Sequence, residues 1–168
     1  MKSMAFGDVI KRNMKLSAVF SGERGRTRRR EFLYVALFCF FCVAVIACLS
    51  VVLYRHFGGN GDSWTFCSVL ISSYFLYALV SCMTRRIHDT GNAAWPLNLS
   101  LNLLIIFIPL WLFKFYMTQD SFRICVAVVA GMSSLFFIYA LILCFRDSEK
   151  ATNRFGPSEK YPTVQSET

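Results

Sequence analysis

Four long apolar runs constrain the fold of this chain more than any other feature. They cover residues 32–54, 64–83, 95–113 and 124–145, and none contains Asp, Glu, Lys, Arg or His. A helix that crosses a bilayer core needs roughly 20 apolar residues, and an ionised side chain at the bilayer centre costs about 2.5–3.5 kcal/mol. The runs therefore predict an all-α, polytopic membrane protein with four transmembrane helices in a bundle. A soluble bundle is the alternative, but four such runs leave no polar face for water.

The runs divide the chain into three parts. We expect a basic cytoplasmic arm over residues 1–31, a transmembrane domain over 32–145 and a cytoplasmic tail over 146–168. Charged residues make up 17% of the chain, whereas soluble domains carry about 25%. Too few residues lie outside the runs for a second core. The first run is too long for the apolar region of a signal peptide, and no cleavage site follows it.

The distribution of Lys and Arg predicts how the chain is threaded. Nine of the eighteen precede the first run, two lie at Arg85 and Arg86, and four lie in the tail; the two remaining loops hold three. Because cytoplasmic loops carry excess Lys and Arg, we expect both termini and the loop up to Trp95 to be cytoplasmic. The net charge of +8 is then a topology signal. We expect no nucleic-acid partner, since the basic residues flank apolar runs rather than a separate folded module.

The seven cysteines all lie inside the apolar runs. There a cysteine behaves as a small, polarisable hydrophobe. Cys39 and Cys42 have CxxC spacing, but lipid does not supply the polar surroundings that activate a thiol. We expect no structural disulfide and no cofactor at these positions.

The segment from Phe6 to Phe20 has helical periodicity. Five residues share one face of the predicted helix: Phe6, Val9, Ile10, Met14 and Ser17. The basic residues Lys11, Arg12 and Lys15 lie off that face. This pattern predicts an N-terminal amphipathic helix in the inner membrane interface, with its basic side toward anionic headgroups. A short helix packed on the cytoplasmic loops is the alternative.

The stretch "MTRRIHDTGNAAWP", residues 83–96, places charges between two apolar runs. At the predicted membrane depth it meets the end of the N-terminal arm. Charges in a partly dehydrated zone are more stable when paired, so we predict a cytoplasmic polar clamp. Its members are Arg26 or Arg28, with Glu31, Arg85, Arg86, His88 and Asp89. The alternative is a set of separately solvated interface residues.

The same stretch could carry chemistry instead. Adjacent His88 and Asp89 are typical of some metal phosphohydrolases, but the other histidine, His56, falls on the opposite side of the membrane. A metal site needs more ligands on one side. No Ser or Cys is placed with His88 by a recognisable motif. We therefore expect no metal and no catalytic residue.

Three motifs together resemble the domain of unknown function 805 family of bacterial inner-membrane proteins. They are "GRTRRREF" (Gly25, Arg26, Arg29, Glu31 and Phe32), "RRIHDTGNAAW" (85–95) and "NRFGPSEKYP" (Asn153, Arg154, Phe155, Gly156 and Pro157). The tail departs from the family pattern in its proline spacing and in "DSEKAT". The resemblance implies a four-helix membrane bundle in the bacterial inner membrane, without an assigned activity. It adds Arg29, Asn153 and Gly156 to the polar clamp, with the last two folding the tail under the bundle.

Polar residues inside the third run have two interpretations. Asn98 and Asn102 are four apart and share one helix face, where amides bond across helices. We predict intramembrane packing for them; a pore lining is the alternative. No run contains an ionisable group of the kind a coupled transporter needs at mid-membrane, so we do not expect a monomeric carrier.

These observations favour a non-enzymatic interaction or regulatory protein. It would present a basic cytoplasmic face to anionic lipid headgroups or to a membrane protein partner, including a second copy. A small oligomeric transporter or channel is the first alternative. A lipid-headgroup enzyme that uses His88 and Asp89 is the second.

Overall fold

The computed structural model describes residues 5–15, 26–57, 61–150 and 153–155. Its secondary-structure elements are all helical over these residues. They are α1 (Phe6–Met14), α3 (Arg29–Phe57), α4 (Gly61–Asp89), α5 (Trp95–Ile105), α6 (Phe107–Leu112), the 3-10 helix η2 (Phe113–Tyr116) and α7 (Gln119–Phe145). Within the described part of the chain, three stretches are long and apolar enough to cross a membrane: Arg29–His56, Phe66–Asp89 and Gln119–Phe145. The chain is therefore a multi-pass helical membrane protein.

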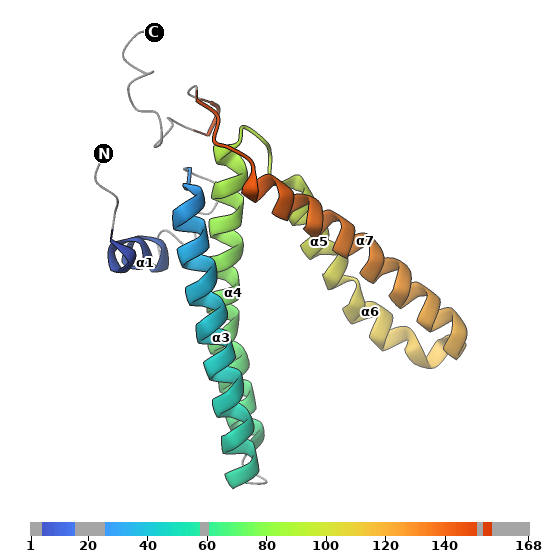
Figure 1. Cartoon of the computed structure of the whole chain (residues 1–168). Coiled ribbons are helices and arrows are strands. Elements are labelled where there is room, and N and C mark those ends of the chain that lie inside the picture. Colours follow the sequence, from blue (N-terminus) through green and yellow to red (C-terminus); the bar gives the residue numbers. More distant parts are fainter. Residues whose placement is uncertain (1–4, 16–25, 58–60, 151–152, 156–168) are drawn as a thin grey trace.

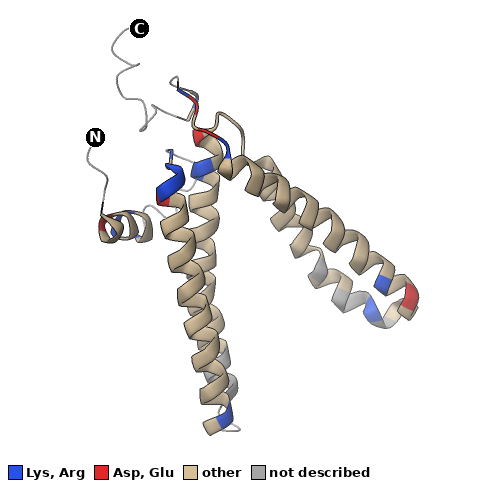
Figure 2. Ribbon diagram, in the orientation of Figure 1, with Lys and Arg blue, Asp and Glu red and all other residues tan. Residues whose placement is uncertain are grey.

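The long helices form two hairpins that meet at one end and diverge from it (Figure 1). One hairpin is α3 with α4, and the other is α5 and α6 with α7. We call the end where they meet the junction: α3 and α5 begin there, and α4 and α7 end there. Lys and Arg gather at the junction (Figure 2), while further charges lie at the far ends of the hairpins.

The apolar core also lies at the junction. It takes residues from the first turns of α3, such as Val35, and from the last turns of α4, such as Ile87. Leu97 of α5 and Leu143 of α7 complete it. These four side chains are 0–2% exposed. The core therefore holds the two hairpins together near the charged residues rather than along the apolar helices.

The helix α1 lies across α3 and packs on the α3/α4 hairpin (Figure 1). Val9 is 1% exposed, and Ile10 and Met14 pack partly buried against the core. The helix ends at Met14, whose carbonyl accepts a hydrogen bond from the Tyr74 hydroxyl at 2.5 Å. The sequence predicts a helix that continues to Phe20, but residues 16–25, including Ser17, lie outside the described part.

Two helix boundaries differ from the apolar runs. α4 continues beyond Met83 to Asp89, so Arg85, Arg86 and His88 are helical rather than part of a loop. Their side chains find partners at the junction, which makes a polar final turn stable. The predicted turn is correspondingly short, with Gly91 at φ 78°.

The third run is broken. α5 ends at Ile105, and α6 begins at Phe107. Proline lacks an N–H, and its ring clashes with the carbonyl four residues earlier, which here belongs to Ile105. Pro109 therefore explains a break near Ile106. A fourth membrane span over 95–113 remains a prediction at this point.

Candidate functional site

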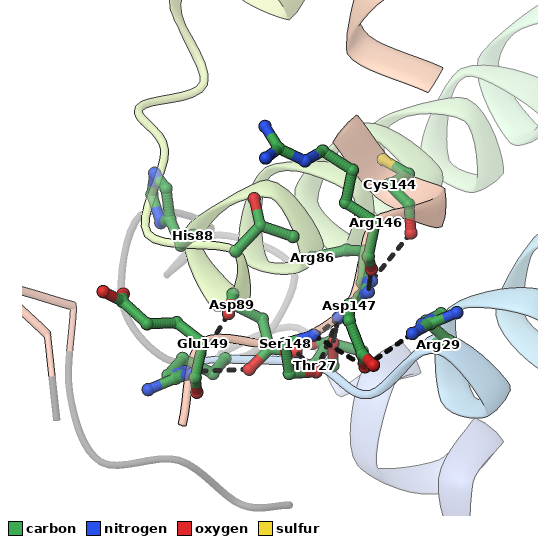
Figure 3. Close-up of polar contacts among 12 residues, drawn as sticks. Thr27, Arg29, Arg86, His88, Asp89, Cys144, Arg146, Asp147, Ser148 and Glu149 are labelled. Carbon is green, nitrogen blue, oxygen red and sulfur yellow. Dashed lines mark hydrogen bonds and ion pairs between the residues drawn. The ribbon is translucent and has the colours of Figure 1, made fainter. Parts of the chain in front are cut away.

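Three regions distant in sequence bring polar groups together at the junction, the third of them comprising two consecutive segments (Figure 3). They are the residues before α3, the last turn of α4, and the end of α7 with the beginning of the tail. Six predicted members of the polar clamp are buried, and three of them bond to one another: Arg26, Arg86 and Asp89. We call these three the buried part. Their side chains are 1%, 0% and 3% exposed, respectively.

Asp89 is the common acceptor. Its Oδ1 accepts a hydrogen bond from Arg26 Nε at 2.8 Å, and its Oδ2 accepts from Arg86 and from the Ser148 hydroxyl. Its backbone carbonyl accepts from Arg26 at 3.0 Å and from the Glu149 amide at 2.9 Å. One residue thus ties the arm, α4 and the tail together.

Arg86 extends this connection to α7. Its Nε donates to the carbonyl of Cys144 at 2.8 Å, and its Nη2 donates to the carbonyl of Arg146. Its Nη1 contacts Ser148 Oγ at 3.1 Å. Arginine suits this position because its planar guanidinium presents five donors in a fixed fork.

Arg26 completes the buried part. Besides Asp89, it donates to the carbonyl of Glu149 at 2.5 Å. Two guanidinium groups share one carboxylate here, and backbone carbonyls and the Ser148 hydroxyl accept further hydrogen bonds from them. Removing one partner of a buried pair costs about 3–5 kcal/mol, because it leaves an uncompensated charge. The arrangement is therefore a structural connection between the hairpins, the arm and the tail.

Two other predicted members bond elsewhere. Arg29 pairs with Asp147 at 2.5 Å, where the side chains are 42% and 63% exposed, and exposed pairs contribute little stability. Glu31 is buried, and it pairs with Arg12 of α1. A carboxylate at the beginning of α3 is also favoured by the helix dipole. Glu31 thus fixes α1 on α3.

Arg85 and His88 face different surroundings from Arg86. Arg85 is 8% exposed, and its Nε lies 3.4 Å from the carbonyl of Ser81 one turn earlier. His88 stacks on Phe155, with ring centroids 3.7 Å apart and an interplanar angle of 2°. Asn153 donates to the carbonyl of His88 at 3.0 Å. These contacts place the described part of the tail against the end of α4; Gly156 lies outside the described residues.

The two intramembrane asparagines lie on the outside of this chain. Asn98 and Asn102 are both exposed. Ser100, between them, is buried against Ser133 of α7. The Ser100 hydroxyl donates to the Ser133 carbonyl at 3.0 Å, and the Ser133 hydroxyl donates to the Ser100 carbonyl at 3.1 Å. Packing by the asparagines stays a prediction, which would require a surface outside this chain.

Sequence reasoning missed the contribution of residues 146–149. Asp147, Ser148 and Glu149 belong to the stretch that departs from the family pattern, yet each contacts a predicted clamp residue. The available signal was their position: acidic and hydroxyl side chains directly follow an apolar helix, at an end rich in arginine. Thr27, whose carbonyl lies 3.4 Å from Arg86 Nη1, carried no such signal.

Described residues at the junction also line cavities. One, of about 480 Å³, is lined by Arg28, Arg29, Arg30 and Ser148. The other, of about 330 Å³, lies beside His88, Phe155 and Trp95. Over the described residues, no three His, Cys, Asp or Glu side chains gather as a metal-binding group. The geometry is that of a structural polar cluster with an arginine-lined cavity at its edge.

The helices and their polar junction define a class of multi-pass membrane protein in which charges gather where the hairpins meet. The family model of DUF805, described as protein of unknown function, matches residues 20–157, so the chain belongs to this family. This confirms the resemblance carried by the three motifs. Neither the search of curated proteins nor the search of solved structures finds a match.

Proposed function

We propose that this protein is a four-span protein of the bacterial inner membrane whose junction lies on the cytoplasmic side. Fifteen of its eighteen Lys and Arg residues belong to the arm, to the segment from Arg85 to Trp95 or to the tail. Excess positive charge marks the cytoplasmic side. The crosswise position of α1 near the junction supports its assignment as an interfacial amphipathic helix.

The fourth span follows from where the helices end. The last turns of α4 and α7 are joined directly, through Arg86 and the carbonyl of Cys144. α7 has 27 residues and is therefore about 40 Å long at 1.5 Å per residue. If α7 crosses the membrane, the chain from Trp95 to Gln119 must cross it in the other direction. α5, α6 and η2 would together form this span.

At the junction, we propose a non-enzymatic interaction function. The observation that carries it is that the arginines of the junction differ in how deeply they are buried. Arg26 and Arg86 are buried and bonded to protein groups, whereas Arg30 is exposed and Arg28 and Arg29 are partly exposed. The buried pair fixes a rim of basic side chains in place. Such a rim suits an acidic partner protein or anionic lipid.

The same geometry argues against catalysis by His88 and Asp89. Asp89 is already shared by two arginines and Ser148. His88 is covered by the ring of Phe155. A general base needs access to a substrate proton, and these contacts favour a structural role for both residues.

Native mass spectrometry after gentle solubilisation tests the proposal. We expect a stoichiometric partner protein or retained anionic lipid, which is lost in the double variant Arg28→Gln/Arg30→Gln. The matched control is Arg55→Gln/Arg123→Gln, which removes the same charge from exposed positions at the far ends of the hairpins. Equal retention in both double variants would contradict an interaction surface at the junction.

Orientation has its own test. A cysteine introduced at Thr90, in the turn after α4, should be labelled by an impermeant maleimide only after the inner membrane is opened. Labelling of intact spheroplasts at this position would place the junction on the outer side and overturn the proposal.

An oligomeric channel is the second candidate, because Asn98 and Asn102 are exposed on an otherwise apolar helix. Polar side chains facing lipid are costly, so a second copy that covers them would be favourable. Solute flux in reconstituted vesicles that disappears in Asn102→Leu would support this candidate over the first.

A further inference from the structure

Basic residues outnumber acidic ones at the junction. In the segments 26–31, 85–89 and 144–150, eight Lys and Arg residues accompany four Asp and Glu residues. Arg12, which pairs with Glu31, adds another positive charge. Like charges held together in a partly dehydrated zone repel one another. A bound anion would therefore stabilise this end of the protein.

The cavity of about 480 Å³ provides a place for that anion. Three consecutive arginines, Arg28, Arg29 and Arg30, line it together with Ser148. It lies beside the beginning of α3, at Arg29, where the positive end of the helix dipole adds to the field. Guanidinium groups match phosphate oxygens with paired hydrogen bonds. The shape and the charge of the cavity thus suit a phosphate group.

An apolar stripe continues from the cavity along α3. Leu33, Leu37 and Phe41 follow Arg30 at three-, seven- and eleven-residue intervals, so they lie on the same helix face. They are 41%, 67% and 69% exposed. A soluble phosphate or an acidic peptide would leave this stripe unused. A phospholipid has an anionic headgroup and an apolar chain in the same order along the membrane normal.

We propose that this cavity binds the phosphate of an anionic phospholipid, with an acyl chain against Leu33, Leu37 and Phe41. The assignment rests on the proposed function and names the ligand of the same surface. Asp147 sits at the edge of the site, because it pairs with Arg29 at 2.5 Å. It competes with the phosphate for one guanidinium, so its removal should strengthen binding.

The test uses the full-length protein reconstituted in phosphatidylcholine vesicles that contain phosphatidylglycerol as a minor component. After extraction, native mass spectrometry measures how strongly phosphatidylglycerol is enriched on the protein over phosphatidylcholine. A basic residue near an anionic surface contributes about 1 kcal/mol, so Arg28→Gln/Arg30→Gln should reduce the enrichment about 30-fold. Asp147→Asn should increase it severalfold, and Arg55→Gln/Arg123→Gln should leave it unchanged.

The test does not depend on one variant, because Arg28→Gln/Arg30→Gln and Asp147→Asn should change the phosphatidylglycerol enrichment in opposite directions. If Arg28→Gln/Arg30→Gln does not fold, Asp147→Asn still must raise the enrichment. No enrichment in the wild type, or none of these changes in the variants, overturns the proposal. Displacement of phosphatidylglycerol by millimolar inorganic phosphate would reassign the cavity to free phosphate. An acidic protein that co-purifies without lipid preference would overturn the lipid site and leave the interaction function standing.

Discussion

The junction and the distal parts of the helices are stabilised in different ways. At the junction, Arg86, Ile87 and Leu97 are fully buried, and helices from both hairpins share one core. Along the three candidate spans, only 17%, 28% and 17% of the most apolar windows are buried within the chain. The hairpins diverge there (Figure 1). The relative position of the hairpins therefore depends on the polar end of the molecule.

The difference between the junction and the distal helices follows from the lipid that surrounds the distal helices. Lipid chains are as apolar as leucine, so apolar helices gain little by leaving lipid for one another. Hydrogen bonds and ion pairs that lie out of bulk water can then decide which helices meet. The polar junction occupies the boundary where arginine and aspartate can be buried together. In this chain, buried charged residues therefore act together with the apolar core of the junction to define how the hairpins pack.

Among the substitutions that test this difference, Asp89→Asn should destabilise the junction most. It removes the carboxylate shared by Arg26 and Arg86 and leaves both cations without it in a buried site. We expect a loss of about 3–5 kcal/mol in the free energy of unfolding, measured by denaturation in mixed micelles, with faster proteolysis of the tail.

The control for Asp89→Asn is Asp120→Asn at the other end of α7, where Asp120 is exposed. It removes one carboxylate from a helix N-terminus, which is worth about 0.3–1 kcal/mol. Equal effects of the two variants would mean that the junction is no more important than the distal ends.

Arg86→Lys separates charge from geometry. Lysine keeps the positive charge but lacks the fork that reaches Asp89, Cys144 and Arg146 together. We expect a loss of roughly 2 kcal/mol, because buried acceptors lose their donors. A second substitution, Arg86→Ala, removes the whole guanidinium group. It should abolish chemical cross-linking between the arm and the tail. Unchanged melting temperature and cross-links in Arg86→Ala would refute the polar clamp.

Gly91→Ala tests how closely the tail approaches the turn. Gly91 has φ 78°, and an added Cβ would lie 2.5 Å from Glu149 Oε2. A left-handed conformation costs other residues about 1–2 kcal/mol, and the Glu149 side chain must also move. We expect destabilisation of that size, measured as a lower melting temperature.

Gly131→Ala in α7 is the matched change for Gly91→Ala. An added Cβ there meets nothing within 4 Å, and alanine favours a helix by roughly 0.5–1 kcal/mol over glycine. The two substitutions should therefore shift the melting temperature in opposite directions. Shifts of the same sign would show that the turn does not control the stability of the junction.

Prediction from the sequence succeeded where the physical signal was local. The lack of Asp, Glu, Lys, Arg and His in the runs identified the helices that form the two hairpins. The motif residues Arg26, Arg86 and Asp89 are neighbours in the structure. Which carboxylate pairs with which arginine was not predictable, because it depends on the direction in which each side chain leaves its helix. Glu31, for example, pairs with Arg12 of α1, a residue outside the predicted clamp.

The boundaries of α4 and the third run were less predictable for different reasons. Hydropathy ended the second run at Met83, but the helix continues because Arg86 and Asp89 find buried partners in other segments. The effect of Pro109 on α5 was foreseeable from the missing N–H. The reciprocal pair of Ser100 and Ser133 was not foreseen, since two isolated serines 33 residues apart give no signal of contact.

Substitutions in that serine pair should have the smallest effect on stability. They are also an uncharged control for the comparison between the junction and the distal parts of the helices. It joins α5 to α7 inside one hairpin, through hydrogen bonds of 3.0 and 3.1 Å, and it involves no charge. Hydrogen bonds between membrane helices average about 0.6 kcal/mol. Ser100→Ala and Ser133→Ala should each destabilise by about this amount, and a double-mutant cycle should give a coupling of similar size. A coupling as large as that between Arg86 and Asp89 would show that neutral polar contacts organise the hairpins as strongly as the charged junction does.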